Sequence, residues 1–268
     1  MTICIAAACD DSKALVLAAD AMWTNRALSI EFEHPLEKMT VLAPGCVALT
    51  AGDALVHVEL FRSVKSEIEQ RSLGVGGIAD LIKSKYRELR GKAIQERVLA
   101  RSGFDNIEHF HRQQSVLLPD LVLGIQQRID DYNLGLEVIL AGMDGPLTHI
   151  YGIGNPGTSA CFDAIGFHTI GSGLPHAATS LIGRDCSQFT SLKECLLFVY
   201  EAKKRAEKAP GVGTKTSLMI IRDAGERRFR PEEIKSLSDS YEKWCKNDID
   251  WEVLIDELLE ARDSLGER

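Results

Sequence analysis

Apolar residues in the first fifty positions follow strand-like patterns. Residues 2–9 and 14–19 each form a short apolar run, and the polar turn 10–13 separates them. Residues 39–43 and 46–50 repeat this arrangement around a Pro-Gly pair. Short apolar runs bounded by turn residues are typical of buried strands. The pattern therefore predicts two hairpins, and thus four strands, before any helix.

A helical period follows the second predicted hairpin. Asp53 has a side chain that caps helices well, and apolar residues recur at four-residue spacing over 56–64, which predicts a helix to about Arg71. A glycine-rich break comes next, and the pattern over 78–99 predicts a second helix. Residues 100–118 are polar and are expected to form a short helical excursion.

The second half of the chain repeats this order of strands and helices. Further strands are expected over 121–125, 137–143, 148–151, 159–170 and 216–221, with helices after Gly173, over 191–208 and in the tail from Pro231. Ser191 and Glu194 fit a capping box at one helix start. Strands and helix pairs in this order suit two packed sheets covered by helices. We therefore expect one domain over residues 1–224, with an insertion at about 90–120, and a charged, helical C-terminal extension over 225–268.

Composition limits the classes of partner. The 268 residues carry a net charge of −8 at pH 7, which argues against nucleic acid and anionic membrane surfaces as partners. No apolar stretch approaches the roughly 20 residues that span a bilayer, and no basic segment precedes a long apolar core at the N-terminus. Seven scattered cysteines include no C-x-x-C pair and are expected to be reduced. These features predict a cytoplasmic protein.

Two short motifs could indicate a bound group, and neither is convincing. The glycines of 152–157 match G-x-G-x-x-G, but Pro156 removes an amide and the next residues read as a strand, whereas a dinucleotide site needs a helix there. His109 and His111 have no nearby cysteine or clear carboxylate partner, which favours a solvated helix face over a metal site. We therefore expect no cofactor and no metal.

Thr2 is the strongest candidate for chemistry. Removal of Met1, which is expected before a small residue, would leave Thr2 with a free α-amine and a hydroxyl. An α-amine titrates at about pH 7.7 to 8, so it can take the hydroxyl proton at neutral pH. Nucleophile and base then come from one residue. Many chains begin Met-Thr, so the hypothesis depends on the residues that follow.

Several later segments support this hypothesis. They are Asp20 in VLAAD, Lys38 in LEKMTVL, Gly52 in LTAGD, the stretch VILAGMDGPLTHIYGIGNPG, and Gly171-Ser172-Gly173 in IGSGLPHAA. With Thr2 in the place of the nucleophile, the chain resembles the proteasome β-type subunits, which are N-terminal-nucleophile (Ntn) hydrolases, from Thr2 to about Arg222. Within that family it is similar to bacterial homologues, including the ancestral β-subunit type. The resemblance implies an α+β fold, a four-layer αββα sandwich.

The resemblance also implies roles for five residues. Thr2 would be the nucleophile, and the positive charge of Lys38 would favour loss of its hydroxyl proton. Asp20 would keep Lys38 charged and oriented. The Gly52 amide would donate to the oxyanion, and Ser172 would hydrogen-bond the amine. Taken singly, each residue other than Thr2 has an ordinary structural explanation, such as a strand end, a surface lysine or a turn.

The late part of the chain departs from the family pattern. The family has an aspartate followed shortly by serine and two glycines, and this chain reads RAEKAPGVGTKTSLMII. Glu207 is expected to replace the aspartate, although its side chain is longer and a proline intervenes. Gly213-Thr214 is only an approximate substitute for the serine-glycine pair.

The expected function is that of a threonine peptidase, which transfers the acyl group of a peptide to Thr2 and then to water. The resemblance implies a peptide or unfolded protein as substrate, a homo-oligomeric ring or open spiral, and an ATP-dependent unfoldase as partner. Thr40, Thr50 and Ala54 are guesses for the pocket lining. Trp251, Leu254, Leu258 and Leu259 in the tail would dock onto the body or a neighbour. Two alternatives stay open, namely a catalytically silent structural subunit of such a ring and an amidase for small amides.

Overall fold

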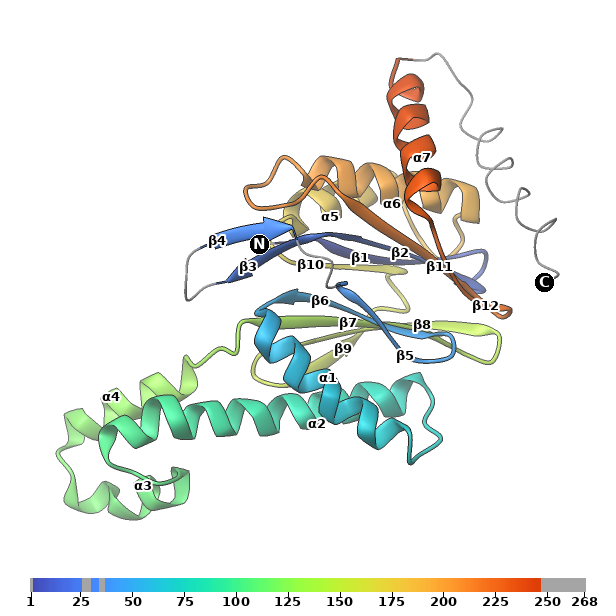
Figure 1. The fold of residues 1–268 in the computed structure, drawn as a ribbon. Helices are drawn as coiled ribbons and strands as arrows, with labels where there is room; N and C mark the ends of the chain where they lie inside the picture. Colours follow the sequence, from blue (N-terminus) through green and yellow to red (C-terminus); the bar gives the residue numbers. More distant parts are fainter. Residues whose placement is uncertain (1, 26–29, 34–36, 247–268) are drawn as a thin grey trace.

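The computed structural model describes residues 2–25, 30–33 and 37–246 (Figure 1). The fold is mixed α+β, as predicted. Two five-stranded antiparallel sheets, a two-stranded ribbon and seven α-helices make up the described part of the chain.

The first sheet has the strand order β10-β1-β2-β11-β12. Its strands are β1 (Cys4–Cys9), β2 (Ala14–Asp20), β10 (Phe167–Ile170), β11 (Thr216–Arg222) and β12 (Gly225–Arg228). Cys4 lies opposite both Ala19 of β2 and Ile170 of β10. This register brings the N-terminal strand, the end of β2 and the end of β10 to one edge of the sheet.

The second sheet has the strand order β5-β6-β7-β8-β9. Its strands are β5 (Met39–Ala43), β6 (Cys46–Gly52), β7 (Leu136–Asp144), β8 (Leu147–Gly154) and β9 (Thr158–Cys161). The ribbon of β3 (Met22–Asn25) and β4 (Ile30–Glu33) follows directly on β2. Six strands therefore precede the first helix rather than the four that were predicted, because the apolar pattern contains no clear signal for this ribbon.

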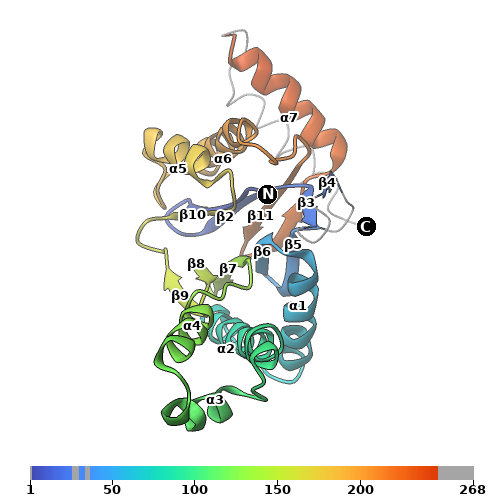
Figure 2. The ribbon, with the colours of Figure 1, turned by 90° about the vertical axis from the view of Figure 1, so that its left-hand side faces the viewer.

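Helix pairs cover the outer faces of both sheets. The α-helices of the described residues are α1 (Ala54–Ile68), α2 (Val75–Ile94), α3 (Ile107–Gln113), α4 (Pro119–Asp130), α5 (Leu174–Gly183), α6 (Leu192–Ala206) and α7 (Pro231–Trp244). Figures 1 and 2 show α5 and α6 on the first sheet and α1 and α2 on the second, with the two sheets facing each other.

Residues of β1 alternate between two apolar cores. Ile5 packs with Leu196 of α6, whereas Ala6 packs with Leu49 in the space between the sheets. Both faces of β1 are therefore covered, and all six of its residues are buried. This explains why the strand reads as a continuous apolar run rather than an alternating one.

Two helix starts follow the predicted capping chemistry. Asp53 Oδ1 accepts from the amides of Leu55 at 2.9 Å and Val56 at 3.3 Å, so α1 begins where expected. Ser191 and Glu194 form the predicted capping box of α6. Each cap satisfies amides that the first turn of a helix leaves without an intrahelical partner.

The strand predicted over 121–125 is wrong, because these residues belong to α4. Pro119 stands in the first turn of this helix, where its missing N–H leaves no intrahelical bond unmade. Ile125 and Ile129 lie one helical turn apart and are buried with Phe110. A short apolar run does not by itself distinguish a strand from a helix, and here the helical spacing decides.

The run 159–170 holds two strands rather than one. β9 belongs to the second sheet and β10 to the first, so the chain crosses between the sheets at this point. Gly166 lies in the turn with a φ of +86°, and a Cβ there would come within 2.7 Å of the Gln188 nitrogen. The turn at Gly166 therefore divides the single strand that the sequence predicts over 159–170.

Residues after α2 form an arm that projects beyond the second sheet (Figure 1). A π-helix over Gln95–Leu99, then α3 and α4, enclose a small apolar core that includes Val98, Phe104 and Phe110. The insertion expected at about 90–120 falls in this arm.

The glycines of 152–157 lie at the end of β8 and in the turn to β9, and no helix follows them. The Arg87 Nε of α2 donates to the Gly157 carbonyl at 2.7 Å, and a Cβ on Gly157 would lie 2.4 Å from Arg87 Cγ. Close packing against α2 therefore accounts for this glycine.

The helix expected from Pro231 is present as α7, but residues 225–228, which were expected to begin a helical extension, form β12 of the first sheet. The tail positions Trp251, Leu254, Leu258 and Leu259 lie outside the described residues. Across the part of the chain that the structure describes, none of the helices combines the length and the apolar character needed to cross a bilayer.

Candidate active site

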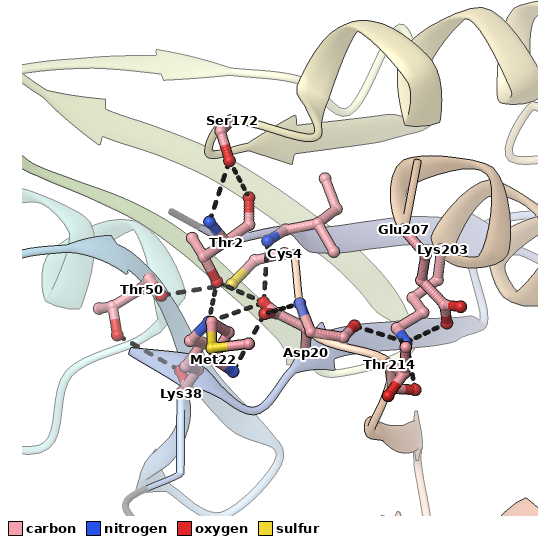
Figure 3. A network of polar contacts seen from close by, with 12 residues as sticks. Thr2, Cys4, Asp20, Met22, Lys38, Thr50, Ser172, Lys203, Glu207 and Thr214 are labelled. Atoms are coloured by element: carbon pink, nitrogen blue, oxygen red, sulfur yellow. Dashed lines mark hydrogen bonds and ion pairs between the residues drawn. The ribbon is translucent and has the colours of Figure 1, made fainter. Parts of the chain in front are cut away.

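Thr2 lies at the edge where β1, β2 and β10 meet, and only 3% of its surface is exposed. Three segments that are distant in sequence surround it: the end of β2, the residue before β5, and the turn after β10 (Figure 3). Met1, whose removal the sequence hypothesis requires, is outside the described residues.

The Thr2 hydroxyl lies between a cation and an anion. Lys38 Nζ donates to Thr2 Oγ1, which in turn donates to Asp20 Oδ1. Lys38 Nζ also contacts Asp20 Oδ1 directly, at 2.6 Å. A cation beside a hydroxyl favours its deprotonated form, so the arrangement suits a nucleophile.

Backbone amides hold Asp20 in place. Its Oδ1 accepts from the Ile3 amide at 2.9 Å, and its Oδ2 accepts from the amides of Met22 at 3.0 Å and Gly213 at 2.9 Å. The Asp20 side chain is fully buried. A buried carboxylate is tolerated only when it is hydrogen-bonded and paired, and Asp20 has both kinds of partner.

Lys38 is almost as deeply buried as Asp20, with 2% of its side chain exposed. Its Nζ lies 5.6 Å from the centre of the Trp23 ring, within reach of a cation–π interaction. The Lys38 carbonyl accepts from the Thr50 amide at 3.1 Å and from Thr50 Oγ1 at 3.4 Å. The backbone of β6 thus fixes where the ammonium group stands.

Behind Thr50 lies a neutral histidine. Thr50 Oγ1 is 2.5 Å from His57 Nδ1, and the His57 ring packs edge-on against Trp23 and Phe61. Burial, helped by the charge of Lys65, lowers the pKa of His57 to about 4. His57 is therefore uncharged at neutral pH and adds no second cation beside Lys38.

The turn after β10 forms hydrogen bonds with the backbone of Thr2. Ser172 Oγ accepts from the Thr2 nitrogen at 3.1 Å and donates to the Thr2 carbonyl at 3.4 Å, and the Gly173 amide donates to the same carbonyl at 3.2 Å. Gly171 has a φ of +99°, and a Cβ on it would lie 2.4 Å from the Thr2 carbonyl oxygen. The glycine is needed for this close approach.

Gly52 ends β6 with a φ of +121°. A Cβ there would lie 1.9 Å from the Gly135 carbonyl oxygen, so packing between the ends of β6 and β7 already requires glycine. An oxyanion role for its amide is therefore additional to a structural one.

Glu207 caps the C-terminal end of α6 and does not bond to Thr2 among the described contacts. Its carboxylate pairs with Lys203 Nζ, which also donates to the carbonyls of Gly213 at 3.1 Å and Thr214 at 2.8 Å. Burial lowers the pKa of Lys203, and the nearby Glu207 opposes that shift. Glu207, which was expected to replace the aspartate of the family pattern, connects to the site through Lys203, the Gly213 peptide and Asp20.

The sequence interpretation missed Lys203, although one signal was available. Leu196, Val199 and Tyr200 are buried on α6, and Lys203 follows them at helical spacing on the same face. A lysine at a core-facing position, four residues before a glutamate, indicates a buried ion pair.

Thr40, Thr50 and Ala54, the guesses for the pocket lining, do not border the cleft beside Asp20. Thr50 is buried and bonded inward, while Thr40 and Ala54 are half-buried. A cleft of about 870 Å³ instead borders Asp20 and Lys38. Its other walls come from α6, α7 and the strands β11 and β12, including Lys204, Thr214, Arg228 and Lys235.

Within the described residues, no group of three or more histidine, cysteine, aspartate or glutamate side chains is arranged to hold a metal ion. His109 Nδ1 lies 3.3 Å from Asp105 Oδ2 on the exposed surface of the arm. The seven cysteines are unpaired, and five of them are buried.

No family model matches the chain, and no curated protein is significantly similar to it. Its function therefore has to be inferred from the residues around Thr2.

Proposed function

We propose that the chain is an Ntn hydrolase of the proteasome β-subunit type, with the four-layer αββα sandwich of that family, which cleaves peptide bonds. The supporting observation is the Thr2 hydroxyl, which accepts from Lys38 Nζ and donates to Asp20 while the Thr2 nitrogen binds Ser172. The two facing sheets with helices on their outer faces agree with that sandwich.

Catalysis begins once any residue that precedes Thr2 has been removed. The free amine takes the Oγ1 proton, directly or through one water, and Oγ1 bonds to the carbonyl carbon of the substrate. The carbon–nitrogen bond then breaks, and the proton passes from the amine to the leaving nitrogen. Water next loses a proton to the amine and attacks the ester, and the proton returns to Oγ1 as the acid leaves.

Each neighbour of Thr2 has a role in these steps. Lys38 stabilises negative charge on Oγ1, and Asp20 balances the charge of Lys38 within the buried site. Ser172 holds one N–H of the amine, so that the lone pair is directed away from it. The Gly52 amide is proposed as the oxyanion donor, a role worth about 3 kcal/mol in other enzymes.

Substrate and assembly follow the same proposal. An extended peptide or unfolded protein is the proposed substrate, within a homo-oligomeric ring or open spiral served by an ATP-dependent unfoldase. Exposed apolar residues on the arm, including Val116 and Leu118, offer surface that such contacts would bury. Light scattering should then give a mass several times 29.5 kDa. A stable 29.5 kDa monomer would contradict assembly.

The burial of Thr2 favours a second candidate, an amidase for small amides. With 3% of its surface exposed, Thr2 offers little room for a large substrate unless nearby segments move. A monomer that hydrolyses small amides but not peptides would support this candidate.

N-terminal sequencing combined with a hydrolysis assay tests the proposal. Active protein should begin at Thr2 and hydrolyse amine-blocked fluorogenic peptides. Activity in material that keeps any residue before Thr2 would contradict the mechanism. Protein that begins at Thr2 but hydrolyses neither peptides nor small amides would instead be a structural subunit.

A further inference from the structure

Lys203 is a fully buried cation with three polar partners. Its Nζ donates to Glu207 Oε1 and to the carbonyls of Gly213 and Thr214, at 3.1 and 2.8 Å for the carbonyls (Figure 3). An ammonium group has three N–H donors, so each donor has an acceptor.

The turn that Lys203 holds is also the turn that supports Asp20. The Gly213 amide donates to Asp20 Oδ2 at 2.9 Å while the Gly213 carbonyl accepts from Lys203. A Cβ on Gly213 would lie 3.2 Å from Asp20 Oδ2 and 3.1 Å from Met22 Cβ, so the turn packs closely against the carboxylate. One peptide segment therefore connects the buried ion pair of α6 to the carboxylate beside Thr2.

Fold stability alone does not explain this lysine. Its neighbours on the same face of α6, Val199, Tyr200 and Ala206, are apolar, and a hydrophobic side chain at position 203 would complete that surface. Replacing a buried ion pair by apolar residues is often neutral or stabilising. An apolar side chain could not hold the two carbonyls, and that function distinguishes Lys203 from a core residue.

We propose that Lys203, held by Glu207, is a positioning residue that fixes the Gly213 amide against Asp20 and so sets the hydrogen bonds around Lys38 and Thr2. The inference rests on the proposed hydrolase function. It also explains Glu207, which acts on the site through Lys203 and the 213–214 turn.

Loss of the Gly213 donor has a definite consequence for catalysis. Without it, Asp20 Oδ2 would keep the Met22 amide as its remaining described donor, so the carboxylate would be held less firmly beside Lys38 and Thr2. The charged groups that face Asp20 are Lys38 from the residue before β5 and Lys203 from α6. Cys4 also lies near, but burial raises its pKa to about 12 and it stays neutral.

The test compares Lys203→Met with Lys204→Met. Lys204 is the matched control for hydrogen exchange, because its Nζ also pairs with Glu207, at 3.3 Å, but makes no hydrogen bond to Gly213 or Thr214 among the described contacts. In Lys203→Met, exchange of the Gly213 amide hydrogen should accelerate at least about tenfold, as expected for local opening. The kcat value should fall about a hundredfold with KM little changed, as for a misplaced catalytic group.

Unchanged Gly213 exchange, or exchange that is equally fast in Lys203→Met and Lys204→Met, would overturn the proposal even if Lys203→Met melts at a lower temperature. If Lys203→Met does not fold, Glu207→Gln serves with the same readouts, since it removes only the negative partner. Wild-type protein without hydrolase activity would contradict the proposed function. Gly213 exchange would then still decide whether Lys203 positions the turn beside Asp20.

Discussion

The Thr2 nitrogen donates to Ser172 Oγ at 3.1 Å, although 170 residues separate them in the sequence. The pairing of β1 with β10 brings them together, because Cys4 lies opposite Ile170 and the turn that follows β10 then reaches Thr2. The position of the amine therefore depends on sheet register. A one-residue slip of this strand pair would turn the side chains to the other face and separate the two groups.

Substitution of Thr2 by alanine should abolish hydrolysis and leave the fold intact. The change removes the hydroxyl that lies between Lys38 and Asp20 and deletes few apolar contacts. Thr2→Ser keeps the hydroxyl and should retain activity, and Thr158→Ala on the exposed strand β9 is the control. Peptide hydrolysis and circular dichroism provide the measurements. Full activity in Thr2→Ala would exclude Thr2 as the nucleophile.

Removing the charge of Lys38 alone should lower the free energy of unfolding more than removing the charges of both Lys38 and Asp20. Lys38→Met leaves the Asp20 carboxylate buried without its cation, and breaking a buried pair in this way costs about 3–5 kcal/mol. Adding Asp20→Asn to Lys38→Met removes the unpaired charge and should recover part of this loss. Denaturant unfolding of the two single variants and the double variant measures the coupling. Additive effects would show that the pair does not interact in the fold.

The residues of the sequence hypothesis differ in how directly they contact one another in the structure. Thr2, Asp20, Lys38 and Ser172 form one connected set of hydrogen bonds. The resemblance to the proteasome β-type subunits indicated them, since each stands in a segment that matches that family, and strand pairing brings these segments together. No hydrogen bond between Gly52 and Thr2 is found among the described residues, and close packing against Gly135 already explains the glycine there.

Lys203 was missed for a different reason. A lysine late in a helix is ordinarily exposed, and its burial here depends on two carbonyls of a turn that has no periodic pattern.

The strand predicted over 121–125 was wrong because its apolar run has the right length for either a strand or a helix. Elements with a clear hydrophobic period can therefore be predicted in this chain, whereas contacts made by irregular turns cannot.

Gly171→Ala should disrupt the site more than an alanine at another glycine with positive φ. At Gly171 the new methyl group would lie 2.4 Å from the Thr2 carbonyl oxygen, in a backbone conformation with φ of +99°. Gly145 has a φ of +61°, and a Cβ added there would meet nothing within 4 Å, so Gly145→Ala carries only the backbone strain of about 1–2 kcal/mol. The melting temperature and the hydrolysis rate should both fall further in Gly171→Ala than in Gly145→Ala. Equal losses in the two variants would show that the turn does not press on Thr2.

The buried histidine behind the site should make the fold sensitive to acid. Burial lowers the pKa of His57 from 6.5 to about 4, so the folded protein keeps this ring neutral while the unfolded chain takes up a proton below about pH 6.5. The unfolded state then binds more protons, and stability falls as the pH drops from 6.5 to 4, by about 3 kcal/mol from this group. Above pH 6.5 His57 contributes no pH dependence.

His57→Phe isolates this effect. Phenylalanine can keep the edge-on contacts with Trp23 and Phe61, and Thr50 Oγ1 can still donate to the Lys38 carbonyl. The variant should be less stable than the wild type at pH 7, because the hydrogen bond between Thr50 Oγ1 and His57 Nδ1 is lost, but the difference should shrink or reverse toward pH 4. Carboxylates that titrate over the same range are shared by both proteins and cancel in the comparison. Denaturant unfolding at several pH values measures the difference in unfolding free energy between the two proteins. Parallel pH curves would show that His57 is not held neutral by burial.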